Sequence, residues 1–354
     1  MRINNEIALD YDDVLLVPHR SRTASRQDVK IERTFNFYHS PRTWTGIPIM
    51  VANMDTCGTF DMSKTLSEYK IITCLHKHYR IDDLVNYFKA IQNHNIDYTW
   101  YSLGIKSDDY LKLKRFQTET QIQPNICIDV ANGYTDDFVN FCRTVRNDFR
   151  HSIIMAGNVA TPEMTQELIL HGGVDIVKVG IGPGSACTTR LKAGVGVPQL
   201  TAIDTCSSAA HGLKSDEKRL GLVCGDGGLK QAGDFAKGFA ANADFLMAGG
   251  IFAGTEQCEG EWEYDLYDAK VSLLFYGMSS KKAQEKHGDG LKEYRSSEGR
   301  IMKIPYKGNV RDVIQDILGG IRSAGSYIGA NTLKDFSKCA EFIRVNRVHY
   351  DRTI

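Results

Sequence analysis

The chain of 354 residues contains 43 Lys plus Arg and 43 Asp plus Glu, so its formal net charge at pH 7 is zero. A neutral chain without a basic tract lacks the electrostatic footprint of a protein that binds nucleic acid or an anionic membrane, so neither partner is expected. No segment reaches the length of a transmembrane helix, and the polar first residues lack a signal-peptide core. The nine cysteines are scattered without CxxC spacing, which is typical of reduced thiols in the cytoplasm.

Eight short apolar runs rich in β-branched residues predict the strands of a parallel sheet. Most begin roughly 22 to 27 residues after the preceding one, which is the spacing of repeated βα units. The predicted strands are residues 47–53, 71–75, 98–103, 125–130, 152–156, 174–180, 220–224 and 245–248. This pattern favours a single (β/α)8 TIM barrel over residues 1–354, with an N-terminal arm, a C-terminal helical tail and no inserted regulatory domain. A doubly wound open sheet is the competing fold, because periodicity alone does not exclude it.

Two long segments interrupt the regular spacing of the strands. Residues 181–219 follow the sixth strand, and residues 251–309 follow the eighth. Long insertions at the C-terminal ends of barrel strands carry active sites and lids, so both segments are predicted to be active-site loops. One helix is predicted to begin at Pro162 after an N-cap at Thr161 and to stop at Gly172. An amphipathic closing helix is predicted over residues 310–324.

Polar side chains follow almost every predicted strand. Each one alone is also explained as a cap or turn residue. In a parallel barrel, however, the C-terminal ends of all strands meet at one rim, where active sites form. We therefore expect these residues to converge on one site. They are Asn53, Asp55, His76, Lys77, Asp129, Asn132, Asn158, Asp226, Gly249 and Gly250.

The strongest candidate for chemistry is the segment GIGPGSACTTR, residues 180–190. Its three glycines permit positive φ angles and close approach of the backbone to a ligand or ion. Cys187 lies at the tip of this loop, and the hydroxyls of Thr188 and Thr189 and the cation of Arg190 follow it directly. A nearby positive charge favours the thiolate, which is the nucleophilic form of cysteine. Cys187 is therefore predicted to be a covalent nucleophile.

Glycine pairs follow the last two predicted strands, at Gly227-Gly228 and Gly249-Gly250. A barrel phosphate site is usually built at this position from backbone amides and a helix N-terminus. Two tight turns are the alternative explanation. Asp226 precedes the first pair, and a carboxylate beside a phosphate cradle is suited to accept hydrogen bonds from a ribose diol. Together these residues predict a nucleoside monophosphate site.

Motifs spread over nearly the whole chain resemble the IMP dehydrogenase/GMP reductase family. Besides the cysteine loop they are ANMDT (52–56), HKHY (76–79), DVANGY (129–134), MAGNV (155–159), YGMSS (276–280), SEGR (297–300) and PYKG (305–308). HKHY, DVANGY and YGMSS are similar to the GMP reductase branch. This resemblance implies a homotetrameric barrel enzyme that uses NADPH to convert GMP to IMP and ammonia.

The resemblance also implies roles for individual residues. Cys187 would add to carbon 2 of the purine, ammonia would leave, and a thioimidate would remain. Thr189 would pair with Glu298 as the proton donor for the leaving amine. Potassium would be held by carbonyl groups at Gly182, Gly184, Cys187 and Arg190.

The binding residues that the resemblance implies fall into two sets. The GMP set is Asp226, Gly227, Gly228, Gly249, Gly250, Gly277, Met278, Ser279, Arg295, Ser296, Ser297 and Gly299. The NADPH set is Lys77, Asp129, Val130, Ala131, Ile181, Gly182, Met278, Tyr294, Arg295, Ser323, Ala324, Gly325 and Ser326, with Ser25 and Arg26 from a neighbouring subunit. An exposed basic residue in an extended arm is the alternative explanation for Arg26.

The chain departs from the family pattern at several places. Gly225 stands where a serine is usual, and the charged stretch LKSDEKRLGLV (213–223) is predicted to lengthen a surface loop. One extra residue precedes the sixth strand, and residues 229–231 also differ. The sequence Ala324-Gly325-Ser326 differs within the implied cofactor site, so the choice of cofactor is the least secure implication.

Three other functions remain open at this stage. An IMP dehydrogenase core without its regulatory domain would use the same cysteine, but its flap carries an Arg-Tyr pair, whereas this chain reads Tyr294-Arg295. A catalytically silent nucleotide-binding homologue would have no physical reason to retain an oxidation-prone thiol beside a proton donor. An aldolase-type barrel would need a Schiff-base lysine such as Lys178, and would leave the cysteine loop unexplained.

Overall fold

The computed structural model describes residues 1, 3–91, 93–288, 290, 292–294 and 296–346. Eight parallel strands form a closed barrel at its centre, and the last strand pairs with the first. Closure excludes the open sheet, so the predicted (β/α)8 TIM barrel is confirmed. In barrel order after closure the strands are β4 (Ile49–Val51), β5 (Ile72–Cys74), β6 (Thr99–Leu103), β7 (Asn125–Asp129), β8 (Ile154–Val159), β9 (Ile176–Val179), β12 (Leu222–Asp226) and β13 (Phe245–Ala248).

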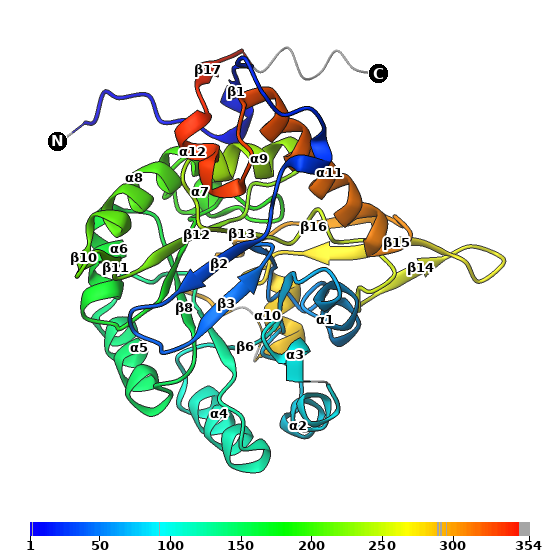
Figure 1. Ribbon diagram of the computed structural model, residues 1–354. Helices are drawn as coiled ribbons and strands as arrows, with labels where there is room; N and C mark the ends of the chain where they lie inside the picture. The colour runs from blue at the N-terminus through cyan, green and yellow to red at the C-terminus, as the bar shows by residue number, and fades with distance from the viewer. Residues whose placement is uncertain (2, 92, 289, 291, 295, 347–354) are drawn as a thin grey trace.

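Helices surround the barrel and pack their apolar faces against it (Figure 1). In α5, for example, Phe138, Cys142 and Val145 are buried at helical spacing, while acidic residues occupy the first turn. The helices are α1 (Phe60–Ser67), α2 (Ile81–Ala90), α3 (Asn93–Ile96), α4 (Ser107–Thr120), α5 (Asp136–Asp148), α6 (Pro162–Leu170), α7 (Thr189–Lys192), α8 (Gln199–Gly212), α9 (Ala232–Ala240), α10 (Lys281–His287), α11 (Val310–Ile328) and α12 (Phe336–Cys339). Among the described residues, none is both long enough and apolar enough to cross a bilayer.

The helix predicted after Thr161 begins at Pro162 and ends at Leu170, just before Gly172. The Thr161 side chain makes no capping hydrogen bond, because its hydroxyl instead accepts one from Tyr134 Oη at 3.3 Å. The closing helix is longer than predicted and ends at Ile328 rather than near residue 324. Gly329 stops it in a left-handed conformation with φ of 75°, which glycine adopts without strain.

The two long insertions contain secondary structure. The first holds α7, α8 and a hairpin of β10 (Lys214–Ser215) and β11 (Lys218–Arg219), which is formed by the charged stretch 213–223. The second forms an antiparallel sheet of β14 (Trp262–Tyr264), β15 (Lys270–Tyr276) and β16 (Ile301–Pro305), with α10 between its last two strands. The hairpin of β14 and β15 extends beyond the ring of helices (Figure 1).

The N-terminal arm closes one end of the barrel. A hairpin of β2 (Arg33–Asn36) and β3 (Thr43–Gly46) places Phe35 and Trp44 against Phe245 of β13, with ring centroids 4.6 and 5.4 Å away. These rings join the side chains inside the barrel in one buried cluster, and each such side chain stabilises the fold by about 1.5–3 kcal/mol. Before this hairpin, β1 (Val14–Leu16) pairs with β17 (Phe342–Arg344). The candidate functional site lies at the opposite end of the barrel, which this hairpin does not cover.

Candidate active site

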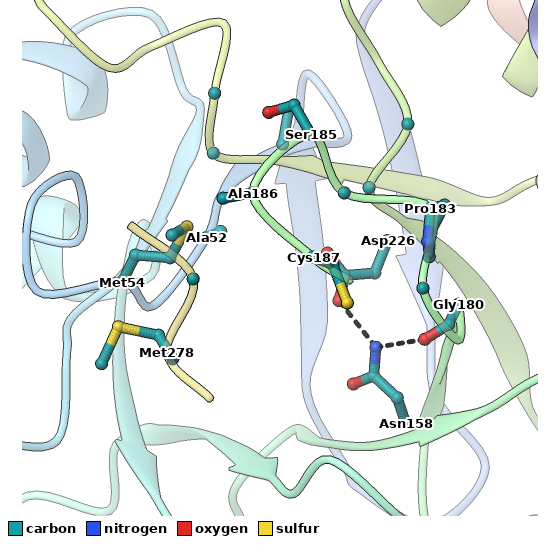
Figure 2. Close-up of a pocket in the computed structure, with 18 of the residues that line it drawn as sticks. Ala52, Met54, Asn158, Gly180, Pro183, Ser185, Ala186, Cys187, Asp226 and Met278 are labelled. Atoms are coloured by element: carbon teal, nitrogen blue, oxygen red, sulfur yellow. Dashed lines mark hydrogen bonds between the residues drawn. The ribbon is translucent and has the colours of Figure 1, made fainter. Parts of the chain in front are cut away.

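A cavity of about 240 Å³ opens at the C-terminal end of the barrel. Several of the polar residues predicted at the strand ends line it, as expected for a TIM barrel rim. They are Asn53, Asp129, Asn158, Asp226, Gly249 and Gly250. Asp55, His76, Lys77 and Asn132 do not line the cavity. Met54 and Met278 form the wall that faces the loop of Cys187 (Figure 2).

Cys187 begins a chain of hydrogen bonds that ends at a carboxylate. Its half-buried thiol donates to Thr189 Oγ1 over a sulfur–oxygen distance of 3.3 Å. Thr189 Oγ1 in turn donates to Glu298 Oε2 at 2.6 Å. The hydroxyl therefore lies between a nucleophile and an acid, which is the geometry required to relay a proton.

Backbone pairing brings Glu298 to the cysteine loop. The Thr188 amide donates to the Glu298 carbonyl at 2.9 Å, and the Arg300 amide donates to the Ala186 carbonyl at 2.9 Å. Close approach requires glycine at two positions of this contact. A Cβ at Gly277 would lie 2.7 Å from the Ala186 oxygen, and a Cβ at Gly299 would lie 2.8 Å from Cβ of Ser280. The segments around residues 187, 277 and 299 therefore form one packed unit.

Arg190 supports the cysteine loop from outside the cavity. Its guanidinium binds Asp10 Oδ2 at 2.8 Å and the carbonyl oxygens of Ile181 and Val197 at 3.4 and 2.7 Å. The sequence predicted that this cation would act on the Cys187 thiol, but in the structure its charge is paired with Asp10. Its role in the loop is therefore structural.

A buried lysine and two carboxylates form the floor of the cavity. Lys178 Nζ donates to Asp129 Oδ1 at 2.7 Å, to Asn158 Oδ1 at 2.8 Å and to Asp226 Oδ2 at 2.6 Å. Asn158 Nδ2 donates to Asp226 Oδ2 and to the Gly180 carbonyl, both at 2.8 Å (Figure 2). These contacts satisfy a charged group that would otherwise be costly to bury.

The electrostatics of the floor exclude a Schiff base at Lys178. Burial lowers the pKa of the Lys178 ammonium, but the negative charges of Asp129 and Asp226 outweigh this effect and hold the pKa well above its usual value. Burial raises the pKa of Asp129, yet the contact with Lys178 produces a net lowering. A Schiff-base lysine must lose its proton before it attacks a carbonyl. The aldolase-type alternative therefore has no support in the structure.

The two glycine pairs form the wall predicted to hold a phosphate. Within the described residues, the amides of Gly228, Gly249 and Gly250 donate no hydrogen bond, so they are available to an anion. The hydroxyl of Ser185 lies against Gly250, because a Cβ on this glycine would be 2.9 Å from Ser185 Oγ.

The start of α9 carries an acidic residue that binds the backbone just before the helix. The amides of Lys230 and Gln231 donate to the carboxylate of Asp234 at 3.0 and 3.2 Å. Within the described residues, the amides of Ala232 and Gly233 in the first turn donate no hydrogen bond, so the helix N-terminus at the phosphate site stays a prediction.

A second polar cluster holds α10 beside the cavity. Asp55, which the sequence placed on the rim, is buried, and its Oδ2 accepts from Tyr276 Oη at 2.6 Å and Lys286 Nζ at 3.0 Å. His287 Nε2 lies 2.6 Å from the same oxygen. Burial raises the pKa of Asp55, but these three contacts outweigh it and produce a net lowering. The cluster anchors the helix that follows Met278.

The predicted binding residues fall into three groups by position. Those that line the cavity are Asp129, Val130, Ala131, Ile181, Gly182, Gly184, Asp226, Gly227, Gly228, Gly249, Gly250, Gly277, Met278 and Ser279. Those outside its lining but in the elements around it are Lys77, Tyr294, Ser296, Ser297 and Gly299. Arg295 lies outside the described residues.

The remaining predicted residues lie on a separate surface. Ser25 and Arg26 are exposed at the start of a short 3-10 helix that contacts α11, and Ser323, Ala324, Gly325 and Ser326 lie on α11 itself. Close packing joins the two segments, since a Cβ at Gly325 would lie 2.8 Å from the Val29 side chain. None of these six residues lines the cavity.

The residues present fit a nicotinamide cofactor better than a transition metal. Asp129, Val130 and Ala131 line one side of the cavity, and Ile181 and Gly182 lie on the cysteine loop beside them. Among the described residues, no group of three or more His, Cys, Asp or Glu side chains could hold a metal ion. A potassium site made of carbonyl oxygens needs no such side chains, and the predicted site at residues 182, 184, 187 and 190 stays a prediction.

Several residues that shape the site are absent from the predicted binding sets. Ser185 lies in the quoted cysteine loop, and Asn158 follows a predicted strand, so both carried a signal. For Lys178, the sequence suggests only the role of a Schiff-base lysine. Asp10 binds Arg190 across 180 residues of sequence, and no local pattern indicates that contact.

Comparison with known proteins agrees with this geometry. The model of the "IMP dehydrogenase / GMP reductase domain" family matches residues 8–351. A GMP reductase of Caenorhabditis elegans is 50% identical over 346 residues, which cover 98% of this chain and 94% of that protein. GMP reductase 1 of Homo sapiens is 48% identical over 352 residues, covering 98% of each chain, and a GMP reductase of Buchnera aphidicola is 47% identical over 346 residues, covering 98% and 97%. The chain therefore belongs to the IMP dehydrogenase/GMP reductase family.

Proposed function

We propose that the protein is a GMP reductase that converts GMP to IMP and ammonia with NADPH as the reductant. The observation that carries this proposal is the chain of hydrogen bonds from Cys187 through Thr189 to Glu298. It joins a nucleophile to a proton donor, and the reaction must both attack a purine carbon and release an amine. The names of the relatives support the same activity.

The first half of the reaction uses residues of the chain alone. The Cys187 sulfur forms a bond to purine carbon 2 while the thiol proton passes to Thr189 and on to Glu298. Glu298 then returns a proton through Thr189 to the amino group, and the carbon–nitrogen bond breaks to release ammonia. The purine stays attached to Cys187 as a thioimidate. The net reaction consumes GMP, NADPH and two protons and yields IMP, NADP⁺ and ammonium.

The second half needs a hydride at carbon 2, and bound NADPH would supply it. Asp129, Val130 and Ala131 would hold the cofactor on their side of the cavity. Cys187 leaves carbon 2 with the sulfur–carbon electron pair, and the thiol regains a proton through Thr189. Residues 298–300 pair with the backbone on both sides of Cys187, and this contact would keep water from hydrolysing the thioimidate.

The substrate would lie with its phosphate toward the glycine pairs. The amides of Gly228, Gly249 and Gly250 and the hydroxyl of Ser185 would bind the phosphate oxygens. Asp226 would accept hydrogen bonds from the ribose diol through Oδ1, since its hydrogen bonds with Asn158 and Lys178 both use Oδ2. Met278 and Ser279 would contact the base.

A homotetramer would complete the cofactor site. The predicted cofactor residues of the arm and of α11 form a surface outside the cavity lining, so one subunit alone would not bring them to the same cofactor. In a homotetramer, Arg26 of one subunit could pair with the 2′-phosphate of NADPH bound to the next. Potassium bound by loop carbonyls would stabilise the cysteine loop.

The decisive test follows NADPH consumption at 340 nm with GMP, beside NAD⁺ reduction with IMP. We expect the wild type to consume NADPH only when GMP is present, and Cys187→Ala to be inactive while still binding GMP. Reduction of NAD⁺ with IMP, without GMP activity, would assign the chain to the dehydrogenase branch. Absence of activity in both assays, with nucleotide binding intact, would favour a nucleotide sensor.

A further inference from the structure

A buried cation joins two carboxylates from strands that are not neighbours. Lys178 lies on β9 and is 3% exposed. Its ammonium binds Asp129, which ends β7, and Asp226, which ends β12. In the barrel, β8 and β9 separate these two strands. One ammonium group therefore fixes the distance between two acidic side chains across the mouth of the barrel.

Asn158 makes this link rigid. Its amide oxygen accepts from Lys178 at 2.8 Å, and its amide nitrogen donates to Asp226 and to the backbone of Gly180. Lys178 therefore has three oxygen acceptors for its three N–H donors, which is the full capacity of an ammonium group. A fully satisfied buried network has one arrangement, and a displacement of one member disturbs the others.

The two carboxylates serve different ligands under the proposed function, on which this inference rests. Asp226 would bind the ribose of GMP, and Asp129 would face the cofactor. Both side chains line the cavity, although they are held by the same buried cation. The network thus places one carboxylate, Asp226, in the proposed nucleotide site and the other, Asp129, in the proposed cofactor site.

We propose that Lys178 is a positioning residue that couples binding of the nucleotide to binding of the cofactor. A ligand that hydrogen-bonds to Asp226 shifts that carboxylate, and through it the ammonium group and Asp129. The second ligand then meets a carboxylate that already has its position in the doubly liganded protein, so its binding no longer includes the cost of moving the network. Coupling of this kind is reciprocal, because each ligand must strengthen the other by the same factor.

The coupling factor is measured by titration calorimetry as the Kd for GMP alone divided by the Kd for GMP with saturating NADP⁺. NADP⁺ carries no hydride, and a Cys187→Ala background prevents covalent addition, so only binding is observed. We expect a factor of at least about five, the lower part of the usual range for coupled sites. In Lys178→Met the factor should fall to within about twofold of one, and Lys178→Arg should recover part of it because it keeps the charge.

Lys237→Met is the matched control. Lys237 is also a buried lysine, and it binds Asp234 at 3.4 Å and the Tyr11 carbonyl at 3.0 Å; none of these three residues lines the cavity. Its loss should lower the melting temperature, as the loss of Lys178 should, but should leave the coupling factor unchanged. If Lys178→Met fails to fold, Lys178→Gln removes the charge and keeps one hydrogen-bond donor.

The outcomes separate coupling from stability. A factor that falls in Lys178→Met or Lys178→Gln and persists in Lys237→Met supports the proposal. A wild-type factor of one, a factor retained in the Lys178 variants, or an equal loss in Lys237→Met overturns it. Failure of the proposed function is distinct, since the wild type would then bind neither GMP nor NADP⁺ or would show no GMP-dependent oxidation of NADPH.

Discussion

Replacement of Thr189 by valine tests the proton relay with little change in shape. The substitution keeps the side-chain volume and removes the hydroxyl that lies between Cys187 Sγ at 3.3 Å and Glu298 Oε2 at 2.6 Å. Glu298 then remains near the cysteine loop, because its backbone is held by the Thr188 amide at 2.9 Å. The variant therefore loses the two hydrogen bonds that join the thiol to the carboxylate, and both groups stay in place.

The size of the effect follows from the contact that is lost. A hydrogen bond to a charged group contributes about 1.5–3 kcal/mol, and about 1.4 kcal/mol corresponds to a tenfold change in rate. If the relay acts in the transition state, kcat should fall about 10- to 100-fold. The KM for GMP should change little, since the hydroxyl is not assigned to substrate binding.

Steady-state oxidation of NADPH at 340 nm provides the measurement, and two variants control it. Thr188→Val removes the neighbouring hydroxyl, whose oxygen is buried and has no hydrogen-bond partner in the described part of the chain, so its kcat should stay near that of the wild type. Thr189→Ser restores a hydroxyl and should recover much of the rate. A Thr189→Val enzyme with kcat within twofold of the wild type would refute the relay.

Three further predictions follow from packing, charge and ion binding. Gly299→Ala should lower kcat at least about tenfold, because its Cβ would lie 2.8 Å from Ser280 Cβ and displace Glu298. The control Gly319→Ala meets no atom within 4 Å inside α11, so it should leave activity unchanged and raise thermal stability slightly, since alanine favours a helix over glycine. The folded-state pKa of Asp55 lies below its ordinary 3.8, so this carboxylate stabilises the fold above that pH, and its contribution is lost as the pH falls through the lower folded value. The free energy of unfolding in urea, measured at pH 7 and pH 3, should therefore depend less on pH in Asp55→Asn than in the wild type, and an unchanged pH dependence would contradict the assignment. Replacement of K⁺ by Li⁺ in the 340 nm assay should lower kcat, and equal rates at constant ionic strength would exclude a potassium requirement.

The barrel could be predicted because its strands carry a local signal. Runs such as 125–130 are apolar and β-branched, and β7 forms there with four of its five residues buried. Strand ends were predicted less well: β4 is two residues shorter at each end than predicted, whereas β8 and β12 extend three and two residues beyond their predicted C-terminal ends. The sheet of β14–β16 was missed, although four of the seven residues of β15 are buried. They are buried in adjacent pairs rather than alternately, and the strand lies within a polar, glycine-rich segment that is typical of loops.

The site could be predicted only where chemistry is concentrated in a short segment. The cysteine loop and the glycine pairs were found because their residues are adjacent in sequence. The contact of Thr189 with Glu298 spans 109 residues, and only the family resemblance suggested it. The shared role of Asp129 and Asp226 depends on Lys178 reaching both across the barrel, which is set by strand tilt and by side-chain direction. A one-dimensional pattern carries no information about that direction.

The contact between Asp10 and Arg190 has a consequence for how the protein acquires activity during folding. Asp10 also accepts from the Gln199 amide at 2.5 Å, and the Leu9 amide donates to Thr201 at 2.8 Å, so the arm joins the end of the cysteine loop to the start of α8. Closing a span of 180 residues is slow compared with forming adjacent βα units. We therefore expect a refolding chain to regain most of its helical circular dichroism before its enzymatic activity, because the activity requires the cysteine loop to be held by the arm.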